Sequence, residues 1–302
     1  MKFFKGLIFL SFLILLSCSE RKSHPMNGVH RIHENIATFP NIVYKMIDSL
    51  DIELDVHVPV LKLGEEPWDI LSEQLKPTLI YFHGGGWVEG ERTSRFLGLL
   101  PYLEKGWCVV NVDYRLLDKT DLIGCLDDCN DAVNWVLENS SKYKFDPDRM
   151  YVSGESAGGH MAMLTGMMDD RARQDILSNP KDRKIAGIIN WYGITDVGKA
   201  IKFWDDPSYT KTISDKWEGD LDMYYDLTSP INYITKHTPP ILSIHGDADV
   251  NVAIGQSIAL HKHLDDEKIK NRLIKVPGKK HGNFSAEELA AIFDGIWAFL
   301  EP

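Results

Sequence analysis

The hydrophobic positions of the chain follow two different periods. Leu50–Val58 places apolar side chains at every second residue, which is the period of a strand with one buried face. Between Asp121 and Glu138 the apolar residues recur at steps of three and four, which indicates a helix with one apolar face. Thr78–Phe82 and Trp107–Val112 are short apolar runs rich in β-branched and aromatic residues, as is typical of buried parallel strands.

The same two patterns alternate up to the C-terminus. They predict strands at residues 150–153, 185–191, 241–245 and 272–276, and helices at residues 157–168, 254–264 and 286–300. Strands that are separated by helices predict a mostly parallel sheet with helices on both faces. We therefore expect a single α/β domain over residues 41–302.

Residues 203–225 interrupt this alternation. The segment shows no clean period and contains aromatic side chains among many aspartates and lysines: Phe203, Trp204, Tyr209, Trp217, Tyr224 and Tyr225. A long irregular segment inside a compact domain is often functional, for example as a lid. The alternative is a surface excursion whose aromatic side chains only attach it to the core. The pattern leaves both interpretations open.

The N-terminus carries a targeting pattern. Two lysines precede an apolar run from Leu7 to Leu16, which is shorter than the roughly 20 residues that span a bilayer and is typical of a signal peptide. The run ends just before Cys18 in a sequence that resembles the bacterial lipobox, although a plain secretory signal is the alternative. We expect residues 1–17 to be a lipoprotein signal peptide and residues 18–40 to be a polar tether. The mature protein would then be exported and anchored to a bacterial membrane through a lipid on Cys18.

The charge and the cysteine content of the chain limit the binding partners and cross-links that can be expected. The formal net charge of −11 disfavours binding to the phosphate backbone of nucleic acids. Acylation of Cys18 would leave three of the four cysteines, and an odd number cannot form a complete disulfide framework. Cys125 and Cys129 fall within a predicted helix and are expected to pack as small apolar residues. No group of cysteines and histidines has the spacing of a zinc site, so we expect no metal.

Gly154–Gly158 has the pattern Gly-x-Ser-x-Gly between a predicted strand and a predicted helix. In this context the pattern indicates a nucleophile elbow, a tight turn that presents the serine hydroxyl at the end of the sheet. The pattern alone would occur by chance in roughly one in ten chains of this length, so the prediction depends on the strand–turn–helix context. Ser156 is therefore the candidate nucleophile.

Three glycines follow His83 at the end of a predicted strand. Successive glycines allow backbone N–H groups to turn toward a developing oxyanion, as in the HGGG motif of lipases and esterases. A serine nucleophile also needs a base, and the acid and the histidine are expected downstream of it in that order. Two loops that follow predicted strands supply these groups: Gly246–Asp249, with an aspartate at each of positions 247 and 249, and the loop that contains His281.

Together these segments resemble a known family. The motifs appear in order over nearly the whole mature chain: His83–Trp87, Asp113–Arg115, Gly154–His160, Pro239–Asp249 and His281–Gly282. They are similar to the esterase/lipase family related to hormone-sensitive lipase, and especially to its bacterial carbohydrate-esterase-like branch of feruloyl and acetylxylan esterases. The resemblance implies an α/β-hydrolase fold. Residues 203–225, which interrupt the alternation of strands and helices, are the candidate lid insert in it.

The resemblance also implies a role for individual residues. Ser156 would be the nucleophile, Asp249 the acid and His281 the base, whereas Asp247 matches a non-catalytic aspartate. The oxyanion hole would be formed by the backbone N–H groups of Gly85, Gly86 and Ala157. The family often has prolines shortly after the acid, but residues 250–253 contain none, which leaves the path of that loop open.

These roles imply hydrolysis of a carboxylic ester through an acyl-enzyme, without a metal or an organic cofactor. The family branch suggests short or aromatic acyl groups on a carbohydrate, and Trp87, Trp204 and Trp217 are candidates for binding the substrate. The same triad can cleave amides, so an exopeptidase or arylformamidase is the nearest alternative. A non-catalytic binding protein is a more distant alternative, because such proteins normally lack one of the catalytic groups.

Overall fold

A computed structural model describes residues 36–60 and 74–301 of the chain. Eight strands form one sheet in the order β1-β2-β4-β3-β5-β6-β7-β8. Their bounds are β1 (Ile36–Ile47), β2 (Leu50–Pro59), β3 (Lys76–Phe82), β4 (Cys108–Val112), β5 (Phe145–Glu155), β6 (Gly187–Trp191), β7 (Ile241–Gly246) and β8 (Asn271–Val276). β2 pairs antiparallel with β1 and β4, and every other pair is parallel. The structure thus confirms the predicted, mostly parallel sheet.

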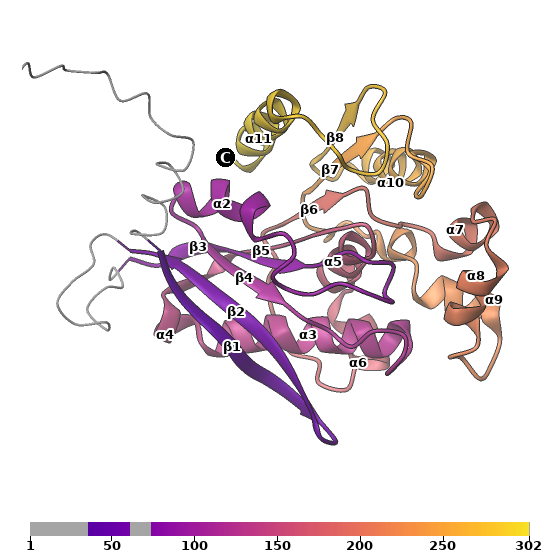
Figure 1. The fold of residues 1–302 in the computed structure, drawn as a ribbon, viewed down its shortest axis with the longest axis horizontal. Helices are drawn as coiled ribbons and strands as arrows, with labels where there is room; N and C mark the ends of the chain where they lie inside the picture. Colours follow the sequence, from indigo (N-terminus) through magenta and orange to yellow (C-terminus); the bar gives the residue numbers. More distant parts are fainter. Residues whose placement is uncertain (1–35, 61–73, 302) are drawn as a thin grey trace, which may run out of the picture.

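Helices cover both faces of this sheet (Figure 1). α2 (Phe96–Glu104) and α11 (Ala286–Leu300) pack on one face, and α3 (Leu122–Glu138), α5 (Ala157–Met167) and α10 (Gly255–Asp266) pack on the other. The shorter helices are α4 (Ser140–Tyr143), α6 (Asp170–Ile176), α7 (Val197–Phe203), α8 (Pro207–Ser214), α9 (Leu221–Leu227) and the 3-10 helix η1 (Pro230–Tyr233).

The two faces of the sheet bury separate apolar clusters. Successive strand residues point to opposite faces, so Leu79 packs beneath α2 and α11 whereas Ile80 packs beneath α3 and α5. Residues 78–82 of β3 are all buried, which explains why the sequence shows continuous apolar runs there. Cys125 and Cys129 lie in the core as free thiols, as predicted, and burial raises the pKa of both.

β1 was not predicted, and residues 36–40 belong to it rather than to the tether. The prediction missed this strand because β1 lies at the edge of the sheet and none of its residues is fully buried. Register shifts after Phe39 and after Val43 also break its pairing with β2, so its apolar residues do not alternate regularly. The tether prediction is therefore wrong at its C-terminal end.

Residues 203–225 contain helices where we expected an irregular segment. α8 and α9 are 8 and 7 residues long, too short to display an apolar period. Each is preceded by an N-cap aspartate whose side chain accepts backbone N–H groups. These aspartates are Asp206 and Asp220. Tyr224 is fully buried, so part of the segment is packed on the core. The role of residues 203–225 as a lid stays a prediction.

The predicted signal peptide, Cys18 and residues 19–35 of the predicted tether lie outside the described residues. None of the helices within residues 36–60 and 74–301 combines the length and the apolar character that a bilayer crossing requires.

Candidate active site

Ser156 lies in the sharp turn between β5 and α5. Its backbone has φ 53° and ψ −118°, a conformation that costs free energy in a residue other than glycine. Two glycines make room for the turn. A Cβ atom on Gly154 would lie 2.3 Å from the carbonyl oxygen of Gly158, and one on Gly158 would lie 2.0 Å from that of Phe82. The Gly-x-Ser-x-Gly pattern therefore has a steric reason in this fold.

Asp249 and His281 meet from the loops that follow β7 and β8. His281 Nδ1 and Asp249 Oδ2 are 2.7 Å apart, so the ring donates through Nδ1 and keeps Nε2 for another partner. Asp249 Oδ1 accepts the N–H groups of Asn251 and Val252 at 2.8 and 3.0 Å. Burial alone would raise the pKa of Asp249, but hydrogen bonds from His245, His281 and Val252 outweigh it and hold that pKa well below its usual range. The carboxylate is therefore ionised at neutral pH.

A second histidine contacts the same carboxylate. His245 is fully buried, and its Nε2 lies 3.2 Å from Asp249 Oδ2 and 2.9 Å from the carbonyl oxygen of Val252. Both partners are acceptors, so Nε2 carries a proton, while Nδ1 lies 2.8 Å from Ser257 Oγ. His245 and the Asp249 side chain together fix the path of residues 250–252, which the missing prolines had left open. His245 was not predicted as a site residue, although its place in β7 at the rim was a usable signal.

Asp247 has a different neighbour. Its side chain accepts the N–H of Gly278 at 2.6 Å, and the residue is exposed. The structure therefore pairs Asp249, and not Asp247, with His281.

The glycine loop after β3 presents free backbone N–H groups. Gly85 and Gly86 have φ values of 112° and 59°, which glycine adopts readily. Within the part of the chain that the structure describes, the N–H groups of Gly85, Gly86 and Ala157 donate to no protein acceptor. The Tyr209 hydroxyl donates to the carbonyl of Gly86 at 2.9 Å and thereby ties this loop to α8. These three N–H groups are available to an anionic oxygen.

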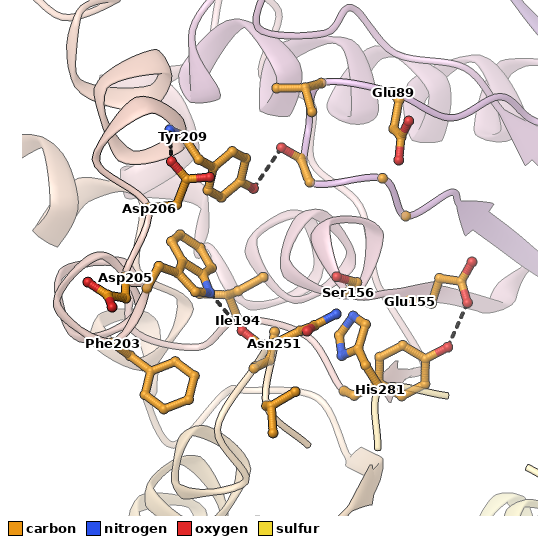
Figure 2. A pocket seen from close by; sticks show the side chains of 18 of the residues that line it. Glu89, Glu155, Ser156, Ile194, Phe203, Asp205, Asp206, Tyr209, Asn251 and His281 are labelled. Atoms are coloured by element: carbon orange, nitrogen blue, oxygen red, sulfur yellow. Dashed lines mark hydrogen bonds between the residues drawn. The ribbon is translucent and has the colours of Figure 1, made fainter. Parts of the chain in front are cut away.

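Ser156 and His281 line one cavity of about 710 Å³ (Figure 2). The glycine loop and the loop after Asp249 form part of its wall. The remaining wall on the side of residues 203–225 consists of Phe203, Trp204, Asp205, Asp206 and Tyr209. The cavity thus combines the candidate triad with aromatic rings and carboxylates.

Of the three tryptophans predicted to bind substrate, the structure brings Trp204 to the cavity. Its Nε1 donates to the carbonyl of Asn251 at 2.6 Å. Trp87 is fully buried behind it, with the two ring centroids 6.2 Å apart, and Trp217 stacks on Tyr224 at 4.7 Å. Neither Trp87 nor Trp217 lines this cavity, because each ring packs against other parts of the protein.

On the opposite side of Ser156, three side chains that were not predicted form a hydrogen-bonded group. The Tyr192 hydroxyl donates to Glu155 Oε2 at 2.7 Å, and Arg95 Nε donates to Glu155 Oε1 at 2.6 Å. The Tyr192 ring lies 4.6 Å from the ring of His281. Burial, and then the Glu155 carboxylate, raises the pKa of Tyr192, so its hydroxyl stays a donor. Glu155 lies inside the elbow motif and Tyr192 just past a strand end, so both offered a signal, whereas Arg95 offered none.

Among the described residues, no three or more His, Cys, Asp and Glu side chains are grouped so that they could hold a metal ion.

Solved structures share this fold. A structure titled as a truncated form of a carbohydrate esterase from gut microbiota matches with a TM-score of 0.74 and 23% identity, and the match covers 88% of this chain and 97% of that one. Esterase B from Lactobacillus rhamnosis matches with a TM-score of 0.72 and 20% identity over 90% of each chain. These matches confirm the predicted α/β-hydrolase fold.

Relatives in sequence include two proteins of Mycobacterium tuberculosis. Esterase LipC is 27% identical over 249 residues, which is 75% of this chain and 60% of LipC. Esterase LipQ is 28% identical over 202 residues, which is 66% of this chain and 48% of LipQ. The chain therefore spans about half to three-fifths of the length of these relatives.

The family model BD-FAE matches residues 70–264, a range that includes the glycine loop, the elbow and Asp249. This match covers more than half of the sequence and confirms the resemblance on which the site was predicted. The chain belongs to the BD-FAE family.

Proposed function

We propose that this protein is a serine hydrolase of carboxylic esters. The observation that carries the proposal is the cavity that Ser156 and His281 both line. There His281 donates a hydrogen bond of 2.7 Å to the buried carboxylate of Asp249. The free N–H groups of the glycine loop support it, because an ester that is attacked by a serine develops an oxyanion. The relatives named as esterases support the same reaction class.

The residues would act in two steps. In the first, His281 Nε2 takes the proton of Ser156 as its Oγ attacks the ester carbonyl, and the oxyanion is held by the N–H groups of Gly85, Gly86 and Ala157. The alcohol leaves with the proton from His281, and the acyl group stays on Ser156. In the second step, water gives a proton to His281 and attacks the acyl carbon. The acid is released, and the proton returns to Ser156.

Asp249 acts through His281. Its carboxylate accepts Nδ1–H, which holds the ring in the tautomer that leaves Nε2 free. Because its pKa lies well below the usual range, the carboxylate is charged whenever His281 becomes protonated, and it stabilises the imidazolium.

We propose short-acyl or aromatic-acyl esters of carbohydrates as the substrate class. Trp204 and Tyr209 offer aromatic faces in the cavity, and Asp205 and Asp206 lie beside them. Such aromatic faces suit a short or aromatic acyl group. The same carboxylates would interrupt the continuous apolar surface that a long alkyl chain needs. The structural neighbour titled as a carbohydrate esterase supports this class.

A hydrolysis panel tests both proposals. The panel contains acetylated and feruloylated xylo-oligosaccharides, p-nitrophenyl acetate and decanoate, and matching p-nitroanilides, with Ser156→Ala as the blank. We expect the highest kcat/KM for the sugar esters. Faster hydrolysis of decanoate would contradict the carbohydrate substrate, and faster hydrolysis of anilides would identify an amidase.

We also propose that the protein is an exported lipoprotein anchored through Cys18. The lipobox-like sequence before this residue supports the proposal. Cys18→Ala should abolish metabolic labelling with a fatty-acid analogue and move the protein out of the membrane fraction. Unchanged membrane retention of Cys18→Ala would contradict the proposal.

A further inference from the structure

A second cavity adjoins the catalytic one. It has a volume of about 700 Å³ and lies between α2, α11 and the loop that follows His281. Arg95, Glu155 and Tyr192 line both cavities. Because these three side chains are hydrogen-bonded to one another, they form a partition between the two cavities.

Aromatic rings form one part of the wall of the second cavity, beside aliphatic side chains of α2 and α11. The rings are those of Tyr81, Tyr102, Trp191, Phe284 and Phe293. Trp191 packs against Phe284 and Phe293 with centroid distances of 6.3 and 6.1 Å, so these rings support one another. Exposed polar side chains, Asn283 and Asp294, lie at the edge. Aromatic faces with polar groups at the rim suit a ring that has an apolar face and a hydroxyl-bearing edge.

The reaction itself determines which part of an ester would lie on this side. The carbonyl oxygen must face the glycine loop, and the leaving alcohol must lie against His281, which protonates it. Tyr192 packs on His281, and the three residues directly after His281, Gly282 to Phe284, line the second cavity. An alcohol that is protonated by His281 would therefore extend along Tyr192 toward the second cavity.

Two local features lie along this route. Gly282 has φ 78°, and a Cβ atom there would lie 3.1 Å from the Tyr192 hydroxyl, so any side chain would crowd the passage. The Arg95 side chain is 50% exposed although Glu155 holds its Nε. Its guanidinium group thus has donors available to hydroxyl groups that pass the partition.

We propose that the second cavity is the subsite for the alcohol part of the substrate, and that this part is a sugar ring stacked on the aromatic wall. The proposal rests on the proposed function and adds a binding site to it. It places the acyl group on the side of Trp204 and the sugar ring beyond Tyr192.

Two neighbouring alanines of α11 provide a matched test. Ala290 and Ala291 are both exposed, but Ala290 lines the second cavity whereas Ala291 does not. Ala290→Trp should fill the subsite, and Ala291→Trp adds the same side chain to the same helix outside it. The readout is the ratio of kcat/KM for an acetylated xylo-oligosaccharide to kcat/KM for ethyl acetate. This ratio is measured on one preparation, so it does not depend on the folded fraction.

We expect Ala290→Trp to lower the ratio about tenfold and Ala291→Trp to leave it at the wild-type value, because the ethyl group is too small to reach the aromatic wall. An unchanged ratio in Ala290→Trp, or an equal fall in both variants, would overturn the proposal. The substrate preference of the wild type distinguishes a failure of this inference from a failure of the proposed function. If it hydrolyses ethyl acetate but no acetylated sugar, the carbohydrate substrate is wrong and this inference falls with it.

Discussion

Ser156 lies between two unlike walls. On the side of His281, Glu155 joins Tyr192 and Arg95 through hydrogen bonds between side chains. On the side of residues 203–225, the aromatic side chains of Trp204 and Tyr209 donate hydrogen bonds to backbone carbonyls. The first wall is held by charge and the second by two neutral hydrogen bonds. The comparison indicates that the first wall comes mainly from strand ends, like the candidate triad, whereas the second comes from residues 203–225, which are distant from Ser156 in sequence.

The largest expected effect is at Ser156, which lies between the two walls. Ser156→Ala should lower kcat by roughly 10⁴- to 10⁶-fold without unfolding the protein, because it removes the nucleophile and leaves the core intact. Burst and steady-state kinetics with p-nitrophenyl acetate measure the loss, and circular dichroism checks the fold. A fall of less than about tenfold would mean that another group attacks the ester.

The next effect separates two aspartates of one loop. Asp249→Asn should lower kcat by roughly 10⁴-fold, because the amide favours the wrong tautomer of His281. Asp247→Asn should change kcat by less than about threefold, since Asp247 bonds to the Gly278 backbone instead. The reverse order of effects would show that Asp247 is the acid.

A smaller effect is expected at His245, behind the triad. His245→Asn removes one donor from the Asp249 carboxylate, so kcat should fall by about tenfold while KM stays close to the wild-type value. The carboxylate would retain more negative charge and favour protonated His281. The acid limb of the pH profile of kcat/KM should therefore move to higher pH. A loss of kcat with an unshifted acid limb would limit His245 to a structural role.

The smallest effect tests the wall formed by residues 203–225. Trp204→Ala should raise KM for an acylated sugar by several-fold, on the order of the loss of one aromatic contact, whereas Trp217→Ala should not. Trp217 serves as the control because it stacks on Tyr224 away from the cavity. Equal KM values for the two variants would mean that the wall of residues 203–225 does not contact the substrate.

The three residues of the candidate triad, which the structure brings together, could be picked from the sequence because their signals are local. Ser156 lies in a pentapeptide motif, and Asp249 and His281 directly follow predicted strands. Arg95 in the first wall could not be predicted in this way. Arg95 meets Glu155 across 60 residues and Tyr192 across 97 residues, and no local pattern encodes such contacts.

The direction of a side chain and elements without a regular apolar period also escaped prediction. Trp87 follows the glycine loop and was expected to meet substrate, but its ring turns into the core. β1 at the sheet edge and the short helices α8 and α9 were missed because neither displays a regular apolar period. The long elements with a full apolar face, such as α3 and α11, were placed within one or two residues of their observed bounds.

The most direct test of the central claim is covalent labelling of the nucleophile. Wild-type protein is treated with a fluorophosphonate and digested, and the modified peptide is identified by mass spectrometry. A single adduct on Ser156, absent from Ser156→Ala and strongly reduced in a His281→Ala variant, is the predicted result. An adduct on another residue, or equal labelling of the Ser156→Ala variant, would contradict the assignment of this site.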